Sequence, residues 1–340
     1  MNIDLNSIWF SLVGVLFAGY AILDGFDLGV GALHLFTRTD EERRILINSI
    51  GPVWDGNEVW LVTGGGALFA AFPMVYATAF SGFYLAMMFL LFALIFRAVA
   101  IEFRSKQPHK WWRQMWDISF SISSMVSGLL IGVALGNIAR GIPLDAQFEY
   151  GGGFFNLLNP YAVIVGLTTV ALFMMHGAIY LVLKTEGALH ERIRGWVNNA
   201  IILFVIFYIA TTMATLLYIP HMMEYIKSHP ILFVVAFLNM LAIANIPREI
   251  HLRYDRRAFL SSCASILALL TLFGIGMYPY MIYSLPNPEH SLTIYNAASS
   301  QKTLQIMLII AAMGMPLALT YTIAIYRIFR GKVKLEPTSY

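Results

Sequence analysis

Long apolar stretches, separated by short clusters of charged residues, constrain the fold of this chain more than any other feature. A helix that crosses a membrane needs about 20 mostly apolar residues. Because 59% of the 340 residues are hydrophobic and only 12% are charged, we predict an all-α, polytopic membrane protein with nine transmembrane helices in one domain, residues 1–340. The predicted spans are 8–35, 50–71, 76–100, 114–137, 160–183, 197–219, 230–247, 258–281 and 303–327.

The distribution of Lys and Arg predicts the orientation of the chain. Basic residues are held on the cytoplasmic side of a membrane, and nine spans divide the remaining segments into two alternating sets. Only three of the 22 Lys and Arg residues, namely Arg140, Lys227 and Lys302, fall in the set that includes the N-terminus. We therefore expect the N-terminus outside and the C-terminus in the cytoplasm.

Four carboxylates, Asp24, Asp27, Asp55 and Glu58, lie within the first two predicted spans. An Asp at the centre of a membrane helix costs about 3 kcal/mol on insertion scales, so such residues face a protein interior or a wet cavity and mark ion or proton paths. At a rise of 1.5 Å per residue, the three Asp residues lie roughly 10 to 21 Å from the inner loops, with Asp55 nearest. These carboxylates predict a proton path from the cytoplasmic face.

A purely structural interpretation of the same carboxylates also stands at this point. Asp55 and Glu58 would then be solvated at the inner end of their helix, and the other two would be bonded to neighbouring backbone.

Four further residues are candidates for supporting roles near the same membrane face. Arg97, Glu102 and Arg104 close the third predicted span. They either pair with one another or with Asp55, or extend toward the headgroups, as long basic side chains do at helix ends. Trp54 either anchors its helix at the inner interface or packs at a contact between subunits.

Two histidines, His34 and His176, are the only ones of eight that fall within predicted spans. A haem with two His ligands needs both imidazoles at matching depth, whereas helix geometry puts His34 about 6 Å and His176 about 12 Å from the inner edge. We interpret His176 as a buried core residue. The only cysteine, Cys263, lies in an apolar stretch. The sequence predicts no catalytic residue, no metal site and no nucleic-acid surface on this chain.

Six segments distributed from one end of the chain to the other carry a distinctive pattern. They are DGFDLGVG at 24–31, ERRILINSIGPVWDGNEVWLVTGGGALFAAFPMVYATAFSGFY at 42–84, FRAVAIEFRSK at 96–106, GVALGN at 132–137, LLNP at 157–160 and SLTIYNAASSQKTL at 291–304. Together they closely resemble subunit II of cytochrome bd-type quinol oxidases. The resemblance is densest in the first 140 residues, and residues 185–290 match in hydropathy more than in identity.

The resemblance implies a bacterial or archaeal plasma-membrane complex that oxidises quinol and reduces oxygen to water. It assigns two haems b, haem d and the quinol-oxidising loop to subunit I, the expected partner. This chain would be a related fold of nine helices, with two four-helix bundles plus one peripheral helix. It would scaffold subunit I and line a cytoplasmic proton path through Asp24, Asp27 and Asp55, with Glu58 as a further candidate. A small single-helix subunit, lipid and a structural quinone are further expected partners.

Two other functions fit the same apolar, acid-bearing sequence. In a stand-alone secondary transporter, the carboxylates would couple ion movement to a solute, and the chain would be active without a partner. In a cytochrome that holds its own haem through His34 and His176, the isolated chain would show a haem spectrum.

Overall fold

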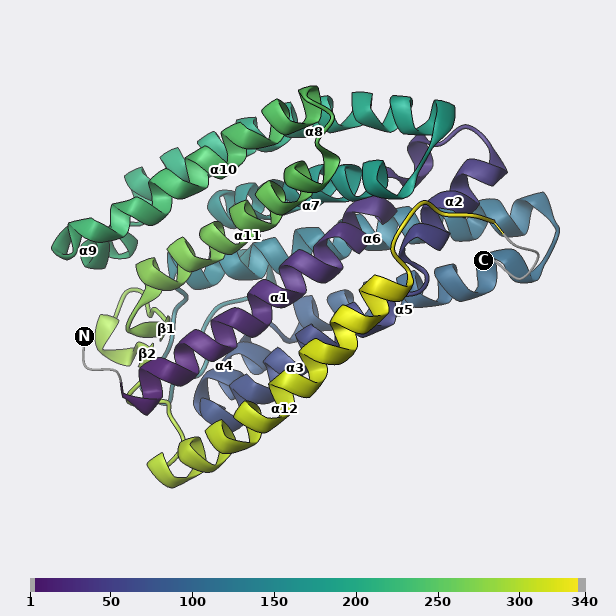
Figure 1. Ribbon diagram of the computed structural model, residues 1–340. Coiled ribbons are helices and arrows are strands. Elements are labelled where there is room, and N and C mark those ends of the chain that lie inside the picture. The colour runs from purple at the N-terminus through teal and green to yellow at the C-terminus, as the bar shows by residue number, and fades with distance from the viewer. Residues whose placement is uncertain (1–3, 336–340) are drawn as a thin grey trace.

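The computed structural model describes residues 4–335 as a bundle of long helices that run between two ends of the molecule (Figure 1). The predicted domain of residues 1–340 therefore extends beyond the described residues at both ends. Within them, eight helices are long and apolar enough to cross a membrane. They are Leu5–Phe36 (α1, Leu5–Leu33, with η1), Tyr84–Lys106 (α5, Tyr84–Phe103, with η2), Lys110–Arg140 (α6), Pro160–Lys184 (α7), Gly187–Tyr218 (α8), Pro230–His251 (η4 with α10, Phe233–His251), Asp255–Met277 (α11) and Gln301–Ile328 (α12).

The remaining elements are shorter and connect the long helices. They are α2 (Asp40–Ile50), α3 (Trp54–Ala71), α4 (Pro73–Gly82), α9 (His221–Ser228), the single turns η3 (Phe154–Leu158) and η5 (Pro288–His290), and an antiparallel pair of strands, β1 (Tyr280–Ile282) and β2 (Leu292–Thr293). The two short strands are a small addition to an otherwise all-α fold.

The second and third predicted spans differ most from the structure. Predicted span 50–71 is not one helix from its start, because α2 ends at Ile50 and α3 begins only at Trp54, after a turn. Helix α3 has 18 residues, and its polar first turns keep it outside the eight apolar helices. Predicted span 76–100 is also wrong at its start. Pro73, which has no N–H to continue a helix, opens the separate helix α4, and α5 begins at Tyr84.

Three other helices begin or end at residues that differ from the predicted spans. Helix α8 starts at Gly187, ten residues before predicted span 197–219, because its polar first turns extend beyond the apolar stretch. Helix α10 runs through Pro247 to His251 instead of ending at the proline. Helix α11 ends at Met277, earlier than predicted span 258–281, and the strand β1 follows it.

Helix α1 is the centre of the bundle. Every residue from Asp24 to His34 is buried, because α3, α6, α7 and α11 surround this part of the helix. Glycines permit the closest approach, between α1 and α7. A Cβ atom at Gly29 would lie 1.8 Å from the carbonyl oxygen of Phe173, and one at Gly177 would lie 2.5 Å from the backbone of Gly29. The two helices therefore touch through backbone, as small residues allow in membrane proteins.

The two ends of the bundle carry different structures (Figure 1). One end holds the start of α1, the strands and α9, and its long connections are joined by backbone hydrogen bonds such as Ile142 N–H to Tyr283 O at 3.0 Å. The other end holds α2, which begins with a capping box between Thr39 and Glu42. Helix α12 runs from the first end toward the second. There the segment after it packs on the end of α7, where Val333 N–H donates to Lys184 O at 2.8 Å.

Candidate functional site

A fully buried ion pair joins α1 to α5. The guanidinium group of Arg97 donates to both carboxylate oxygens of Asp24, with Nη1 to Oδ2 at 2.9 Å and Nη2 to Oδ1 at 2.5 Å. Neither side chain has any exposed surface. Arg97 Nη2 also donates to Glu58 Oε1 of α3 at 2.8 Å. The two parallel bonds to Asp24 are the bidentate geometry that makes Arg–carboxylate pairs strong. The same cation also holds Glu58 of a third helix through a single bond.

The second aspartate of α1, Asp27, has only neutral partners. Its Oδ2 accepts a hydrogen bond from Asn57 Nδ2 of α3 at 2.7 Å, and Asn57 Oδ1 accepts from the hydroxyl of Tyr326 of α12 at 2.9 Å. Oδ1 of Asp27 is buried and has no hydrogen-bond partner within residues 4–335. An unpaired charge in such a place is costly, and no cation is among the hydrogen-bond partners of Asp27 in the part of the chain that the structure describes.

Helix α3 presents a different environment on its outer side. Asp55, in the first turn, is exposed, and the Glu58 side chain keeps 24% of its surface. The exposed residues continue along one stripe at helical spacing, through Val59, Val62, Gly66 and Phe69. The depth predicted for Asp55 assumed one continuous helix from residue 50, whereas α3 begins only at Trp54. The residue lies at the very start of its helix.

The supporting residues fall in places that the sequence did not indicate. Arg97 and Arg104 are both buried instead of extending to the headgroups, and neither pairs with Asp55. Trp54 packs within the core of this chain. Glu102 is half-buried at the end of α5.

A second charged cluster, missed in the sequence analysis, lies near the α2 end of the bundle. Asp117 of α6 is fully buried and accepts from Arg104 Nε at 2.5 Å and from Arg43 Nη1 at 2.8 Å. It also lies 2.6 Å from His34 Nε2. Arg104 extends the cluster to Asp40 of α2 at 2.7 Å. This cluster joins four segments, η1, α2, η2 and α6, and stabilises the α2 end of the bundle. The only acidic residue of predicted span 114–137 is Asp117, and that was the signal that could have found it.

The two histidines do not fit a shared haem. Both ring nitrogens of His176 have partners, with Nδ1 2.8 Å from Ser262 Oγ and Nε2 2.9 Å from Ile22 O. His34 is engaged by Asp117. Since His176 has no nitrogen left for iron, the reading of this chain as a cytochrome with a His34–His176 haem is not supported. The interpretation of His176 as a buried, hydrogen-bonded core residue agrees with these contacts.

These features define a class of protein: a polytopic helical membrane protein whose interior holds ion pairs that span several helices. A family model, Cytochrome bd terminal oxidase subunit II, matches residues 5–329. The chain belongs to this family, as its sequence motifs predicted, and it is a multi-pass membrane subunit of a bd-type oxidase.

Relatives match along their whole length. The chain is 39% identical over 363 aligned positions to "Cytochrome bd-I ubiquinol oxidase subunit 2" of Escherichia coli strain K12, with 98% of this chain and 96% of that protein covered. It is 35% identical to "Cytochrome bd ubiquinol oxidase subunit 2" of Bacillus subtilis strain 168, with 99% of each covered. A chain in the structure of bd oxidase from Geobacillus thermodenitrificans superposes with a TM-score of 0.79 at 18% identity, covering 96% of this chain and 98% of that one, and thus shares the fold.

Proposed function

We propose that this chain scaffolds the haem-bearing subunit I of a quinol:oxygen oxidoreductase in a prokaryotic plasma membrane and supplies part of its proton-input path. The relatives named ubiquinol oxidase subunit 2 support quinol as the reductant. The two haems b and haem d of such an oxidase belong to subunit I in this proposal.

Helix α3 is the ninth crossing in this proposal. The start of α1 and the end of α12 lie toward opposite ends of the bundle (Figure 1), which requires an odd number of crossings. Eight helices qualify by composition within residues 4–335, and α3 with α4 supplies the remaining passage. The excess of Lys and Arg then puts the α2 end in the cytoplasm. The division into two four-helix bundles plus a peripheral helix remains part of the proposal.

The outer stripe of α3 is the proposed contact with subunit I. This stripe consists of Asp55, Val59, Val62, Gly66 and Phe69. A carboxylate on a membrane helix normally faces protein or water and not acyl chains. Along the stripe, Gly66 leaves open space where a side chain would be, and small residues of this kind let a second helix approach closely. Helix α12 is largely exposed as well, since none of the residues in its most apolar stretch is buried.

The carboxylates take two roles in the proposed path. Asp55 and Glu58 lie on the exposed side of α3, one helical turn apart, where protons from the α2 end reach them and pass toward the partner. Asp24 lies behind them as a fixed anion paired with Arg97. Because Arg97 also binds Glu58, the pair sets the electrostatic environment of that carboxylate. Asp27 lies one turn further along α1 and accepts from the neutral Asn57 of α3. The pair of carboxylates in the first turns of α3, with Asp55 exposed and Glu58 half-buried, is the observation that carries this proposal.

The test is oxygen consumption by the assembled oxidase with a neutral residue in the path. We expect Asp55→Asn to lower quinol-driven oxygen reduction about a hundredfold, the lower end of what positioned proton transfer contributes, with the complex and its haems intact. Glu58→Gln should have a smaller effect. A matched control is Glu224→Gln, an exposed residue of α9 at the opposite end, which should leave turnover unchanged. Normal turnover of an intact Asp55→Asn complex would refute the conduit role of Asp55.

A further inference from the structure

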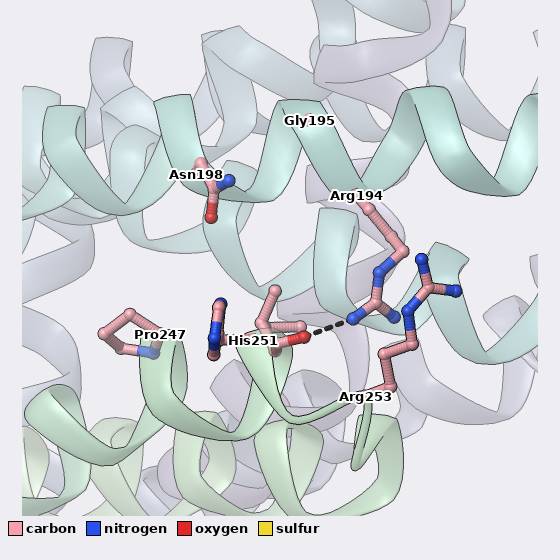
Figure 2. A pocket seen from close by; sticks show the side chains of 7 residues that line it. Arg194, Gly195, Asn198, Pro247, His251 and Arg253 are labelled. Carbon is pink, nitrogen blue, oxygen red and sulfur yellow. Dashed lines mark hydrogen bonds between the residues drawn. The ribbon is translucent and has the colours of Figure 1, made fainter.

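A polar pocket opens at the α2 end of the bundle, between α8 and the turn that joins α10 to α11 (Figure 2). Its volume is about 260 Å³, and its lining includes Arg194, Asn198, Pro247, His251 and Arg253. No carboxylate is among the lining residues in the part of the chain that the structure describes. Two guanidinium groups, an imidazole and an amide therefore face a space large enough for a phosphate group.

Arg194 is held in place by the fold and still has donors to offer. Its side chain is only 10% exposed. Nη1 donates to Asp255 Oδ1 at 2.5 Å, and Nη2 donates to the carbonyl oxygen of Ile250. These contacts use two of the five N–H donors of a guanidinium group. The group is thus pre-oriented at the pocket by the end of α10.

Arg253 occupies a backbone position that usually belongs to glycine. Its φ is +60°, and it follows the end of α10 in a Schellman motif, with Tyr254 N–H donating to Glu249 O at 2.9 Å and Arg253 N–H to Ile250 O at 3.2 Å. A left-handed conformation costs about 1–2 kcal/mol for a residue other than glycine. An arginine at this position is explained if its side chain has a role at the pocket.

The acidic neighbours do not neutralise the pocket fully. Asp255 pairs with Arg194, and Glu191 lies 3.0 Å from Arg253, but the latter pair is well exposed, with 67% and 55% of the side-chain surfaces open. Arg253 donates to Glu191 from both Nη1 and Nη2, the second at 3.4 Å. Exposed ion pairs contribute only about 0–1 kcal/mol to stability, so an anion in the pocket can compete with Glu191 for Arg253. The exposed Arg248 in the last turn of α10 and the exposed Arg256 and Arg257 in the first turn of α11 lie close along the chain.

Two apolar stripes begin at the pocket and continue along the exposed sides of its helices. On α8, Asn198 is followed at helical spacing by Ile202, Ile206 and Ile209, each of which is more than half exposed. On α10, Pro247 is preceded at the same spacing by the exposed Ala244, Met240 and Phe237. Both helices are mostly unburied in the structure, so a cationic pocket here continues into two membrane-facing apolar surfaces.

We propose that this pocket binds the phosphate of an anionic phospholipid, with the acyl chains lying along the stripes of α8 and α10. A free phosphate would use the same guanidinium groups but would have no use for the apolar stripes. The inference rests on the proposed function in one respect: subunit I covers the α3 and α12 side, and α8 and α10 lie on the opposite side of the bundle (Figure 1).

The experiment is native mass spectrometry of the purified oxidase in detergent, titrated with phosphatidylglycerol or phosphatidylcholine. We expect tighter binding of phosphatidylglycerol. Arg253→Gly and Asn198→Asp should each weaken it about five- to tenfold, which corresponds to roughly 1 kcal/mol for a basic residue at a membrane surface. Arg253→Gly suits the left-handed backbone, so the helix end is preserved. Asn199→Asp, the same change one residue away and outside the lining, should bind like the wild-type oxidase.

Several outcomes would overturn the proposal. One is equal binding of the two lipids, and another is unchanged affinity for phosphatidylglycerol in both pocket variants. A third is that Asn199→Asp weakens this affinity as much as the pocket variants do. Full competition by millimolar inorganic phosphate would identify a free-anion site. The Asp55→Asn oxidase should keep the affinity for phosphatidylglycerol. Loss of the proton role and loss of the lipid site would therefore be seen separately.

Discussion

Two regions of the bundle hold their helices together by different means. In the first region, formed by α1, α3, α5 and α6, the fully buried contacts are ionic, between Asp24 and Arg97 and between Asp117 and Arg104. In the second region, formed by α7, α8, α10 and α11, the ion pair between Arg194 and Asp255 lies at the adjoining ends of α8 and α11, and hydrogen bonds further along these helices join neutral groups. Asn239 is fully buried there, donating to the hydroxyl of Tyr208 at 3.2 Å and accepting from Ser265 at 3.0 Å.

The comparison teaches that packing alone does not require the charges. Neutral interhelical hydrogen bonds, worth about 0.6 kcal/mol each in a membrane, suffice for the second region, together with its apolar core. A buried ion pair must first offset the cost of removing both charges from water. The first region contains buried ion pairs in spite of this desolvation cost, and one of them, Asp24 with Arg97, lies next to Glu58 of α3. This placement supports a functional reason for the charges.

The largest expected effect comes from breaking the ion pair that distinguishes the first region. Arg97→Ala leaves Asp24 buried and unpaired, which should lower the free energy of unfolding by about 3–5 kcal/mol. The measurement is the thermal unfolding of the purified complex, with assembly yield as a second readout. The double variant Arg97→Gln with Asp24→Asn, in which both charges are gone, should recover much of the loss. A single variant as stable as the wild-type protein would show that the pair does not hold α1 to α5.

A matched change in the second region should be milder. Asn239→Ala removes the hydrogen bonds to Tyr208 and Ser265, and we expect a loss of about 1 kcal/mol, typical of neutral hydrogen bonds. The same thermal unfolding assay applies. A loss as large as that of Arg97→Ala would break the comparison, since neutral contacts would then matter as much as the buried ions.

The smallest effect concerns an ion pair outside the spans that links the two regions. Glu42 of α2 pairs with Arg192 of α8. Partial burial raises the pKa of Glu42, but the contact with Arg192 and the backbone N–H groups of Arg38 and Thr39 lower it, and the net pKa lies below the ordinary value of 4.5. The stability from this pair is therefore present above pH 4.5 and is lost as the pH falls through the depressed pKa.

The corresponding measurement is thermal unfolding across this pH range in the wild-type complex and in Glu42→Gln. The difference in unfolding temperature between the wild-type complex and Glu42→Gln should become smaller below pH 4.5. A difference that stays constant down to pH 3 would contradict a stabilising role for the ionised Glu42.

The sequence predicted the membrane class, the family and the interior position of Asp24 and Asp27, because apolar length and carboxylates in spans are local signals. It did not predict that Asp24 pairs with Arg97, 73 positions away along the chain, since such contacts depend on how α1 and α5 pack. The depth predicted for Asp55 assumed a helix that is continuous from residue 50. The turn before Trp54 separates two helices, and apolar content alone does not show it.

The second charged cluster, around Asp117, illustrates the same limit. Asp117 could have been singled out as the lone carboxylate of its span, yet its partners come from η1, α2 and η2, three short segments whose placement depends on the tertiary fold. Arg43 counted only as a marker of the cytoplasmic side, and Arg104 was a candidate for a pair with Asp55, Arg97 or Glu102 and not with Asp117.

The central claim is that carboxylates on the outer side of α3 carry protons from the α2 end to the oxygen chemistry of subunit I. Time-resolved proton uptake after the fully reduced complex is mixed with oxygen tests this most directly. We predict that Asp55→Asn slows proton uptake about a hundredfold and leaves the preceding oxygen binding unchanged. Proton uptake at the wild-type rate in a fully assembled Asp55→Asn complex would contradict the account.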